Sequence, residues 1–327
     1  MEFYQVAGTD IRLSRVALGG HEYLPNGNSR GFNEDFAKAI TPGGTFPGFG
    51  GENRKAILRA AYDAEVNFFD VTLDAEKEAL GRNLAEMPPP YDVFVQTRPE
   101  AMNYSYDPGN RKMLDLGLLR AEVQRILKVL RRERLELLNL GILSAALEGN
   151  RDYLAKLADN VKALRKEGLI LFAAADTFSG EQTYKAMIAS GAFATLNINF
   201  NIADDVPERT IFSVARKSNV RVVVREAFIK GVLFRLGREA GITDDALLAR
   251  AAMKWLGSRP GIDTVIVGAN SADHFRDNLR AFQAPSLDQS ETDILAKLRT
   301  APSFKALVQQ KHDEFVAGSA IGQRSAL

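Results

Sequence analysis

The chain has 327 residues, of which 46% are hydrophobic and 25% charged, and its 42 lysines and arginines nearly balance 41 acidic residues. The resulting net charge of +1 argues against nucleic acid as the main partner, because phosphate binding needs clustered positive charge. The chain contains no cysteine, which excludes disulfides, thiolate nucleophiles, iron–sulfur clusters and zinc–thiolate sites.

The N-terminal segment has neither the basic start nor the apolar stretch of a signal peptide. No apolar run approaches the ~18 residues that a membrane-spanning helix needs. We therefore expect a cytoplasmic protein that acts on a small molecule, with neither nucleic acid nor a membrane as its partner.

Eight short apolar runs predict strands along the chain. Most are nearly continuous in apolar residues, as strands buried on both faces should be. They lie at residues 15–20, 67–71, 93–98, 137–143, 170–176, 194–201, 220–225 and 264–269.

Helical patterns separate these runs. Leu154, Leu157, Val161 and Leu164 fall on one helical face, and Gly168 follows as a stop signal. Eight strand–helix repeats predict a single (β/α)8 TIM barrel domain over residues 1–327. A doubly wound open sheet is the alternative, but no phosphate-binding glycine fingerprint follows the first strand.

Two segments depart from this repeat. Residues 25–51, directly after the first strand, are rich in Gly, Pro and Asn. Loops of this length are functional or disordered, so the segment is either a substrate-covering lid or a mobile surface loop. Residues 300–327 predict a helix followed by a polar tail, which we expect to fold over the mouth of the barrel together with the first segment.

Several stretches carry a family resemblance. The opening FYQVAGTDIRLSRVALGG, the segment AAYDAEVNFFD at residues 60–70, LGRNL at 80–84, AMKWLGSRPGIDTVIVGANS at 252–271 and HFRDNL at 274–279 together span nearly the whole chain. In these motifs the sequence resembles the aldo-keto reductase superfamily. The resemblance implies a barrel with an N-terminal hairpin and reduction of carbonyl groups by a nicotinamide cofactor.

The resemblance also assigns a catalytic tetrad, of which this chain retains one member. Asp70 matches the family's aspartate, but residues 71–79 contain no tyrosine, Arg98 occupies the lysine position and Gly141 the histidine position. Because the family mechanism needs a phenol as general acid, we expect generic aldehydes to be reduced very slowly or not at all. The loop tyrosines Tyr23, Tyr104 and Tyr106 are alternative donors, since all three follow barrel strands. Arg98 is expected to pair with Asp70.

The cofactor positions are altered too. Asp176 and Thr177 replace the Ser-Asn pair that grips the carboxamide, Asn197 replaces a Gln, and Arg225 replaces the aromatic that stacks on the nicotinamide. NADP(H) binding is thus possible but weakened or lost. At the positions that the resemblance assigns to the adenine end of the cofactor, the residue types agree better with those of the family. These residues are Ala252, Ala269, Ser271, His274, Asp277 and Asn278. Ser271 either holds a phosphate at a helix N-terminus or merely caps that helix.

Polar residues gather at the predicted strand ends: His21, Glu22, Asp70, Arg98, Asp176, Asn197, Asn199, Arg225 and Glu226. They form either a repurposed active site or a network of rim ion pairs. We predict catalytic roles for Asp70, Arg98, His21 and Asp176. We predict substrate binding by Arg225, Asn199 and Glu22, with the two arginines holding an anionic group. A metal held by these carboxylates has little support, and we predict none.

Three functions remain open. The first is a divergent nicotinamide-dependent oxidoreductase with a new proton donor such as His21 or a loop tyrosine. The second is a non-redox enzyme on the same barrel, a lyase, isomerase or epimerase acting on a hydroxylated acid or sugar. The third is a catalytically silent binding protein.

Overall fold

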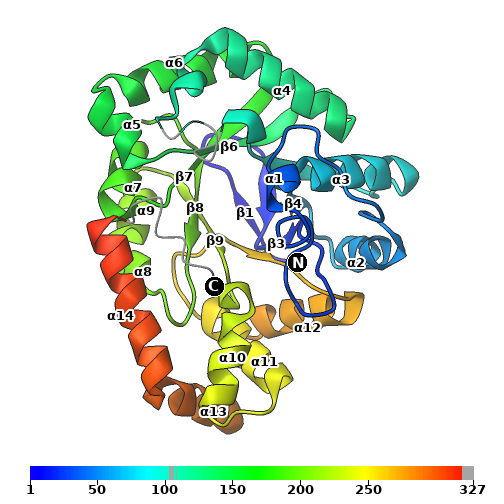
Figure 1. The fold of residues 1–327 in the computed structure, drawn as a ribbon, viewed down its shortest axis with the longest axis vertical. Coiled ribbons are helices and arrows are strands. Elements are labelled where there is room, and N and C mark those ends of the chain that lie inside the picture. The colour runs from blue at the N-terminus through cyan, green and yellow to red at the C-terminus, as the bar shows by residue number, and fades with distance from the viewer. Residues whose placement is uncertain (103–106, 108, 319–327) are drawn as a thin grey trace.

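The computed structural model describes residues 1–102, 107 and 109–318, and it shows a closed barrel of eight parallel strands (Figure 1). The strand order around the barrel is β10-β3-β4-β5-β6-β7-β8-β9, so every strand neighbours the next one along the chain. All eight predicted strands are confirmed. Their bounds are β3 (Val16–Gly19), β4 (Phe68–Asp70), β5 (Phe94–Thr97), β6 (Leu135–Gly141), β7 (Ile170–Asp176), β8 (Thr195–Asn199), β9 (Arg221–Arg225) and β10 (Thr264–Val267).

Amphipathic helices surround the strands and bury their apolar faces against them. In α6 (Tyr153–Lys166), Leu157, Val161 and Leu164 are buried, and the chain leaves the helix at Gly168, whose φ of 75° suits glycine. The other helices that follow strands are α2 (Glu52–Asp63), α3 (Asp74–Glu86), α4 (Leu116–Leu130), α7 (Gly180–Ala189), α9 (Phe212–Lys217), α11 (Asp245–Gly257) and α12 (Ala272–Gln283).

An antiparallel hairpin closes the barrel at the end where its strands begin. Its strands are β1 (Phe3–Gln5) and β2 (Arg12–Ser14). Val6 and Leu13 of the hairpin are buried against inward-facing apolar side chains of the barrel strands. Those inward residues are Ala17, Phe68, Leu137, Phe172, Ala174 and Val223. The lower half of the barrel interior is therefore a packed apolar core, and the polar side chains of the strands gather at the opposite end.

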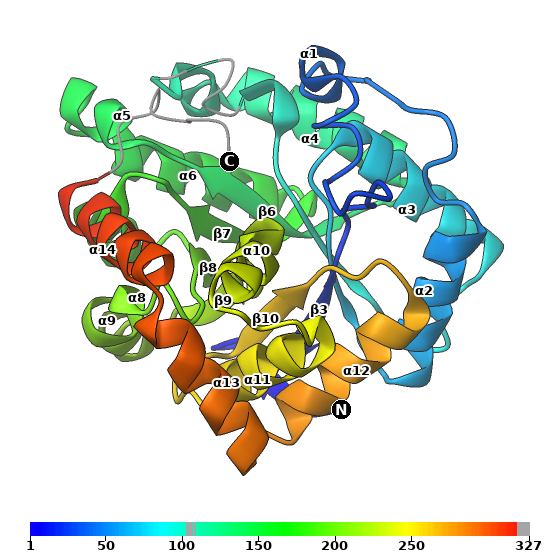
Figure 2. The same ribbon diagram turned by 60° about the horizontal axis from the view of Figure 1, so that its bottom comes forward.

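Shorter and C-terminal elements complete the outer layer: α1 (Phe36–Ala39), α5 (Ser144–Gly149), α8 (Val206–Thr210), α10 (Val232–Glu239), α13 (Gln289–Thr300), α14 (Pro302–Ala317) and the 3-10 turns η1 (Glu100–Met102), η2 (Arg111–Leu114) and η3 (Ile229–Gly231). Helix α14 lies along the outside of the barrel against α7 and α10 (Figure 2). The predicted C-terminal helix is confirmed, whereas residues 319–327 of the tail lie outside the described residues.

The segment 25–51 is docked rather than free. Phe46 and Phe49 pack on Ala75 and Ala79 of α3. The backbone N–H of Gly43 donates to Asp74 Oδ2 at 2.6 Å, at the start of the same helix. These contacts place the segment over one side of the barrel mouth.

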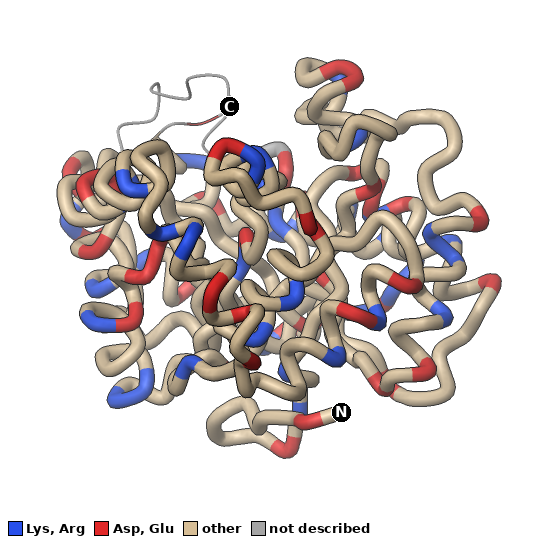
Figure 3. The backbone as a smooth tube through the Cα atoms, turned by 90° about the horizontal axis from the view of Figure 1, so that it is seen from below, with Lys and Arg blue, Asp and Glu red and all other residues tan. Residues whose placement is uncertain are grey.

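Lysines and arginines are interspersed with acidic residues over the fold (Figure 3). No helix of the described residues combines the length and the apolar character of a membrane span.

Candidate active site

The polar groups of the mouth come from the strand positions that follow the apolar core. Side chains on one face of a strand recur every second residue. Asp70, Asp176 and Arg225 lie two residues after the inward-facing Phe68, Ala174 and Val223, so they point into the upper end of the barrel. Parallel strands place their carboxyl ends together, which is why residues far apart in sequence meet here.

His21 forms a tight pair with Glu76 at this mouth. The Nδ1 of His21 lies 2.6 Å from Glu76 Oε1, and the His21 side chain is 39% exposed while that of Glu76 is 1% exposed. Glu76 lies in the first turn of α3, where its Oε2 accepts the backbone N–H groups of Thr72 at 2.8 Å and Leu73 at 3.2 Å. The imidazole thus rests on a carboxylate that the helix start holds in place.

The charges of this pair stabilise each other. Burial disfavours the imidazolium, but the charge of Glu76 and its hydrogen bond outweigh burial and raise the pKa of His21. Burial likewise works against the carboxylate, yet His21 and the two backbone N–H groups lower the pKa of Glu76. A pair of this kind favours a protonated histidine beside the mouth.

Asp70 belongs to a buried amide network. Its Oδ1 accepts from Gln96 Nε2 at 2.7 Å, and Gln96 also exchanges two hydrogen bonds with Asn197, at 3.0 and 3.1 Å. Burial raises the pKa of Asp70, and the Gln96 hydrogen bond and the charge of Arg98 oppose that rise. Asn197, predicted to bind cofactor, has both its amide atoms engaged by Gln96.

The expected pair between Asp70 and Arg98 is wrong. Asp70 and Gln96 are paired in the register of β4 and β5, so the side-chain amide of Gln96 is the group that hydrogen-bonds the Asp70 carboxylate. Arg98, two residues further on, instead donates from Nη2 to Thr72 Oγ1 at 3.4 Å. Arg98 still acts on Asp70 through its charge.

On the opposite side of the mouth, Arg225 binds Asp176 and Asn199. Its Nη1 and Nη2 donate to the two carboxylate oxygens of Asp176 at 2.7 and 2.6 Å, and its Nε donates to Asn199 Oδ1 at 2.7 Å. The guanidinium also lies 5.2 Å from the centre of the Phe178 ring. Asn139 adds a longer contact to Asp176, at 3.4 Å. A bidentate pair with side chains only 3% and 15% exposed fixes this half of the mouth.

Two other predicted residues turn toward the rim. Glu22 accepts from the backbone N–H of Gly50 at 2.6 Å and from Arg30 Nη1 at 3.3 Å, which ties the ends of the docked segment together. Glu226 pairs with Lys230 at 3.4 Å. The carboxylates of the mouth therefore have separate partners, and the described residues contain no cluster of three potential metal ligands.

Tyr23 belongs to the loop after β3, and its hydroxyl lies beside Gly268, the residue that follows β10. A Cβ placed on Gly268 would meet the Tyr23 hydroxyl at 2.0 Å, so the phenol fills the space that a side chain would need. Burial raises the pKa of Tyr23, with Arg54 opposing that rise. Tyr104 and Tyr106 lie outside the described residues.

On the adenine side the predicted residues differ in access. Ser271 is the N-cap of α12, where its Oγ accepts the backbone N–H of His274 at 3.2 Å, and His274 is exposed. Asp277 is exposed and pairs with Arg280 at 3.1 Å. Three others are buried: Ala252, Ala269 and Asn278.

Sequence reasoning missed Glu76, Gln96 and Asn139. Gln96 could have been found, because it precedes Arg98 by two residues and so shares its inward face. Glu76 carried a weaker signal, as an acidic residue in the first turn of a helix after a strand end. A buried cluster at the same helix start was also missed, in which Lys77 and Arg125 both bind Asp74, at 2.8 and 2.6 Å. Burial opposes the charge of Asp74, but these cations lower its pKa.

Comparisons with known proteins agree with the barrel. The model of the Aldo/keto reductase family matches residues 44–246, a range that includes Asp70, Arg98, Asp176 and Arg225. Among solved structures, the aldo-keto reductase AKR11C1 from Bacillus halodurans in its holo form superposes with a TM-score of 0.64. It shares 18% identity and covers 91% of this chain and 96% of its own. No curated protein sequence matches the chain. Because the family model covers more than half of its length, the chain belongs to the aldo/keto reductase family.

Proposed function

We propose that this protein is a nicotinamide-dependent oxidoreductase that reduces a carbonyl group, with His21 as the proton donor in place of a tyrosine. Membership in the aldo/keto reductase family supports the oxidoreductase class. The observation that carries the role of His21 is its 2.6 Å contact with Glu76 at the mouth of the barrel, close enough to Asp70 for that carboxylate to favour the imidazolium as well.

His21 has the properties of a general acid. Its Nδ1 is engaged by Glu76, and its Nε2 makes no hydrogen bond to another described residue, so the Nε2–H is available to a substrate oxygen. The raised pKa keeps more of the imidazole protonated near neutral pH. Glu76 acts as a positioning residue, since it sets the ring orientation and stabilises the positive charge. A general acid of this kind typically contributes about 10²–10⁴-fold to the rate.

A reduced nicotinamide, when bound, supplies the hydride. The chain offers one good place for such a cofactor, the N-terminus of α12, where Ser271 and His274 leave the first turn accessible to a phosphate. The nicotinamide end fits less well, because Arg225 and Asp176 already occupy each other there. We therefore propose NADP(H) binding that is weakened relative to an open site.

The proposed substrate is a small carbonyl compound, anionic if an arginine of the mouth takes part. Arg225 can hold such an anion only through its remaining N–H groups or by giving up Asp176. His21 remains 39% exposed beside Glu76.

The first test is titration with NADPH and NADH, followed by quenching of Trp255 or by nicotinamide fluorescence. Binding supports the proposal. Absence of binding overturns it and leaves the non-redox enzyme or the silent binding protein.

The second test is the pH dependence of turnover. Activity should fall as pH rises through the pKa of His21, and His21→Gln should remove about 10²–10⁴-fold of the rate. Glu76→Gln should lower the pKa of His21 and move the fall to lower pH. Glu78→Gln, on a partly exposed position of the same helix where Glu78 pairs with Arg82 and not with His21, is the control. A profile that Glu76→Gln leaves in place, or full activity in His21→Gln, contradicts the assigned donor.

A further inference from the structure

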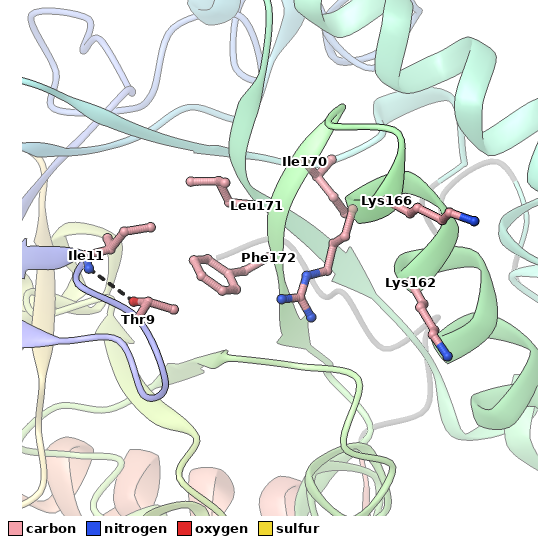
Figure 4. A pocket seen from close by; sticks show the side chains of 8 residues that line it. Thr9, Ile11, Lys162, Lys166, Ile170, Leu171 and Phe172 are labelled. Carbon is pink, nitrogen blue, oxygen red and sulfur yellow. Dashed lines mark hydrogen bonds between the residues drawn. The ribbon is translucent and has the colours of Figure 1, made fainter.

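A depression of about 420 Å³ opens at the end of the barrel opposite the mouth. It lies between the turn of the N-terminal hairpin, the last turns of α6 and the start of β7 (Figure 4). Its lining residues are Thr9, Ile11, Lys162, Arg165, Lys166, Ile170, Leu171 and Phe172. This volume lies within the range of small-molecule sites.

Three cations of α6 line one side of this depression. Lys162, Arg165 and Lys166 are spaced so that they share one helical face, and none of them forms an ion pair with a carboxylate of the described residues. The neighbouring acid in sequence, Glu167, is already engaged by Arg120 at 2.6 and 2.7 Å. Asp10 of the hairpin turn does not line the depression. Within the described part of the chain, the positive charge here is therefore not paired with a carboxylate.

The floor is apolar and aromatic. The guanidinium of Arg165 lies 5.4 Å from the centre of the Phe172 ring, and Ile11 and Leu171 lie beside that ring. The hydroxyl of Thr9 donates to the Val6 carbonyl at 2.9 Å and accepts from Ile11 N at 3.1 Å, so its bonds stay within the hairpin. Arg165 is thus the group that can recognise a polar ligand beside the ring, whereas Figure 4 shows Lys162 and Lys166 extending from α6 away from Phe172.

The helix dipole accounts for only part of this arrangement. Cations are favoured in the last turn of any helix. In α6, however, the terminal carbonyls of Leu164 and Arg165 already accept backbone N–H groups, from Leu169 at 3.0 Å and Gly168 at 3.1 Å. A dipole effect requires neither a hollow nor an aromatic ring beneath the charges. Three full charges also exceed the partial negative charge of about one half at the helix end.

We propose that this depression binds a small organic anion, whose aromatic or other apolar part lies against Phe172 and whose carboxylate or phosphate pairs with Arg165, while Lys162 and Lys166 add to the positive field around it. Apolar contact and charge pairing are both needed, because exposed charges alone contribute little. The site is separate from the mouth, so it stands whether or not the mouth reduces carbonyls.

Isothermal titration calorimetry with 4-phenylbutyrate tests this proposal, with the neutral 4-phenylbutanamide and inorganic phosphate as comparison probes. We expect 4-phenylbutyrate to bind at low-millimolar concentration or better, more tightly than either comparison probe, and to weaken as salt is added. Arg165→Gln should lower the affinity at least about tenfold. Lys128→Gln removes a cation of the last turn of α4 that forms no ion pair with another described residue, and it is the matched control, expected to leave the affinity unchanged.

Circular dichroism confirms that each variant is folded, and turnover at the mouth should be the same in Arg165→Gln as in the wild type. The proposal is overturned if 4-phenylbutyrate does not bind, if the amide binds equally well, or if Arg165→Gln binds like the wild type. Binding that survives Arg165→Gln but is lost in His21→Gln would place the anion at the mouth instead.

Discussion

Asp204 is a buried carboxyl that forms no ion pair with another described residue. It lies in the loop after β8, is 6% exposed, and its Oδ1 makes no hydrogen bond to a described residue. Burial raises its pKa from 3.8 to about 7, Lys311 opposes the rise, and Glu226 and Glu314 add to it. Since the folded protein prefers the protonated form, stability should fall as pH rises from the unfolded pKa near 3.8 to about 7, and should stay reduced above that.

The size of this effect follows from the same pKa. A rise from 3.8 to about 7 corresponds to about 4 kcal/mol of unfolding free energy, at ~1.36 kcal/mol per pKa unit. Asp204→Asn keeps the shape and cannot ionise. The unfolding free energy of the variant should match that of the wild type at about pH 4, where Asp204 of the folded protein is protonated. At about pH 8 it should exceed that of the wild type by up to about 4 kcal/mol.

Urea unfolding followed by circular dichroism at both pH values measures this difference. Comparing variant with wild type at each pH removes the contribution of the other titrating groups. Asp205→Asn is the control, because Asp205 is about half exposed and paired with Arg209, so its loss should change stability by less than ~1 kcal/mol. The reasoning is refuted if Asp204→Asn is less stable than the wild type at about pH 8, or if the difference in unfolding free energy is the same at both pH values. In either case, ionisation of the buried Asp204 does not destabilise the folded protein.

Two further substitutions test the packing of the mouth. Gly268→Ala should destabilise the protein by about 1–3 kcal/mol, since the new Cβ would meet the Tyr23 hydroxyl, and adding Tyr23→Phe should recover part of that loss in thermal unfolding. Arg225→Met should cost about 3–5 kcal/mol because it leaves the Asp176 carboxylate buried and unpaired, and adding Asp176→Asn should restore much of it. Thermal shifts with small carboxylates, sugar acids and phosphates then separate ligand binding from ion pairing: an anion that stabilises the wild type and Arg225→Met equally shows that Arg225 has no ligand role.

The barrel could be predicted from the sequence because its signal is repeated eight times. Buried parallel strands are nearly continuous apolar runs, and each is followed by a helix with a clear apolar face, so errors of one or two residues at an end do not change the fold. The predicted run at residues 137–143, for example, begins two residues late against β6 (Leu135–Gly141) and still identifies the strand.

The site was harder to predict because its contacts depend on which side chain reaches a partner first. The strand ends predicted that Asp70, Arg98, Asp176 and Arg225 would lie at one end of the barrel, and the charges of Arg98 and Arg225 do act on Asp70 there, whereas the roles of these residues stay predictions. Their pairing did not follow from the same reasoning, because Gln96 stands beside Asp70 in register and displaces Arg98 from it. Periodicity gives the face on which a residue lies, whereas pairing depends on side-chain length and depth within the barrel.

The mouth and the opposite depression should also differ in how fast they capture charged molecules. At the mouth, Glu76 holds His21, Asp176 holds Arg225 and Glu22 holds Arg30, so opposite charges lie within a few ångströms of each other. Such pairs produce little field at a distance, and a charged substrate should reach the mouth at a rate that depends weakly on ionic strength, near the ~10⁵–10⁶ M⁻¹s⁻¹ of unsteered encounters. The unpaired cations of α6 should instead draw anions from beyond contact range, so that stopped-flow association there slows markedly as salt is added.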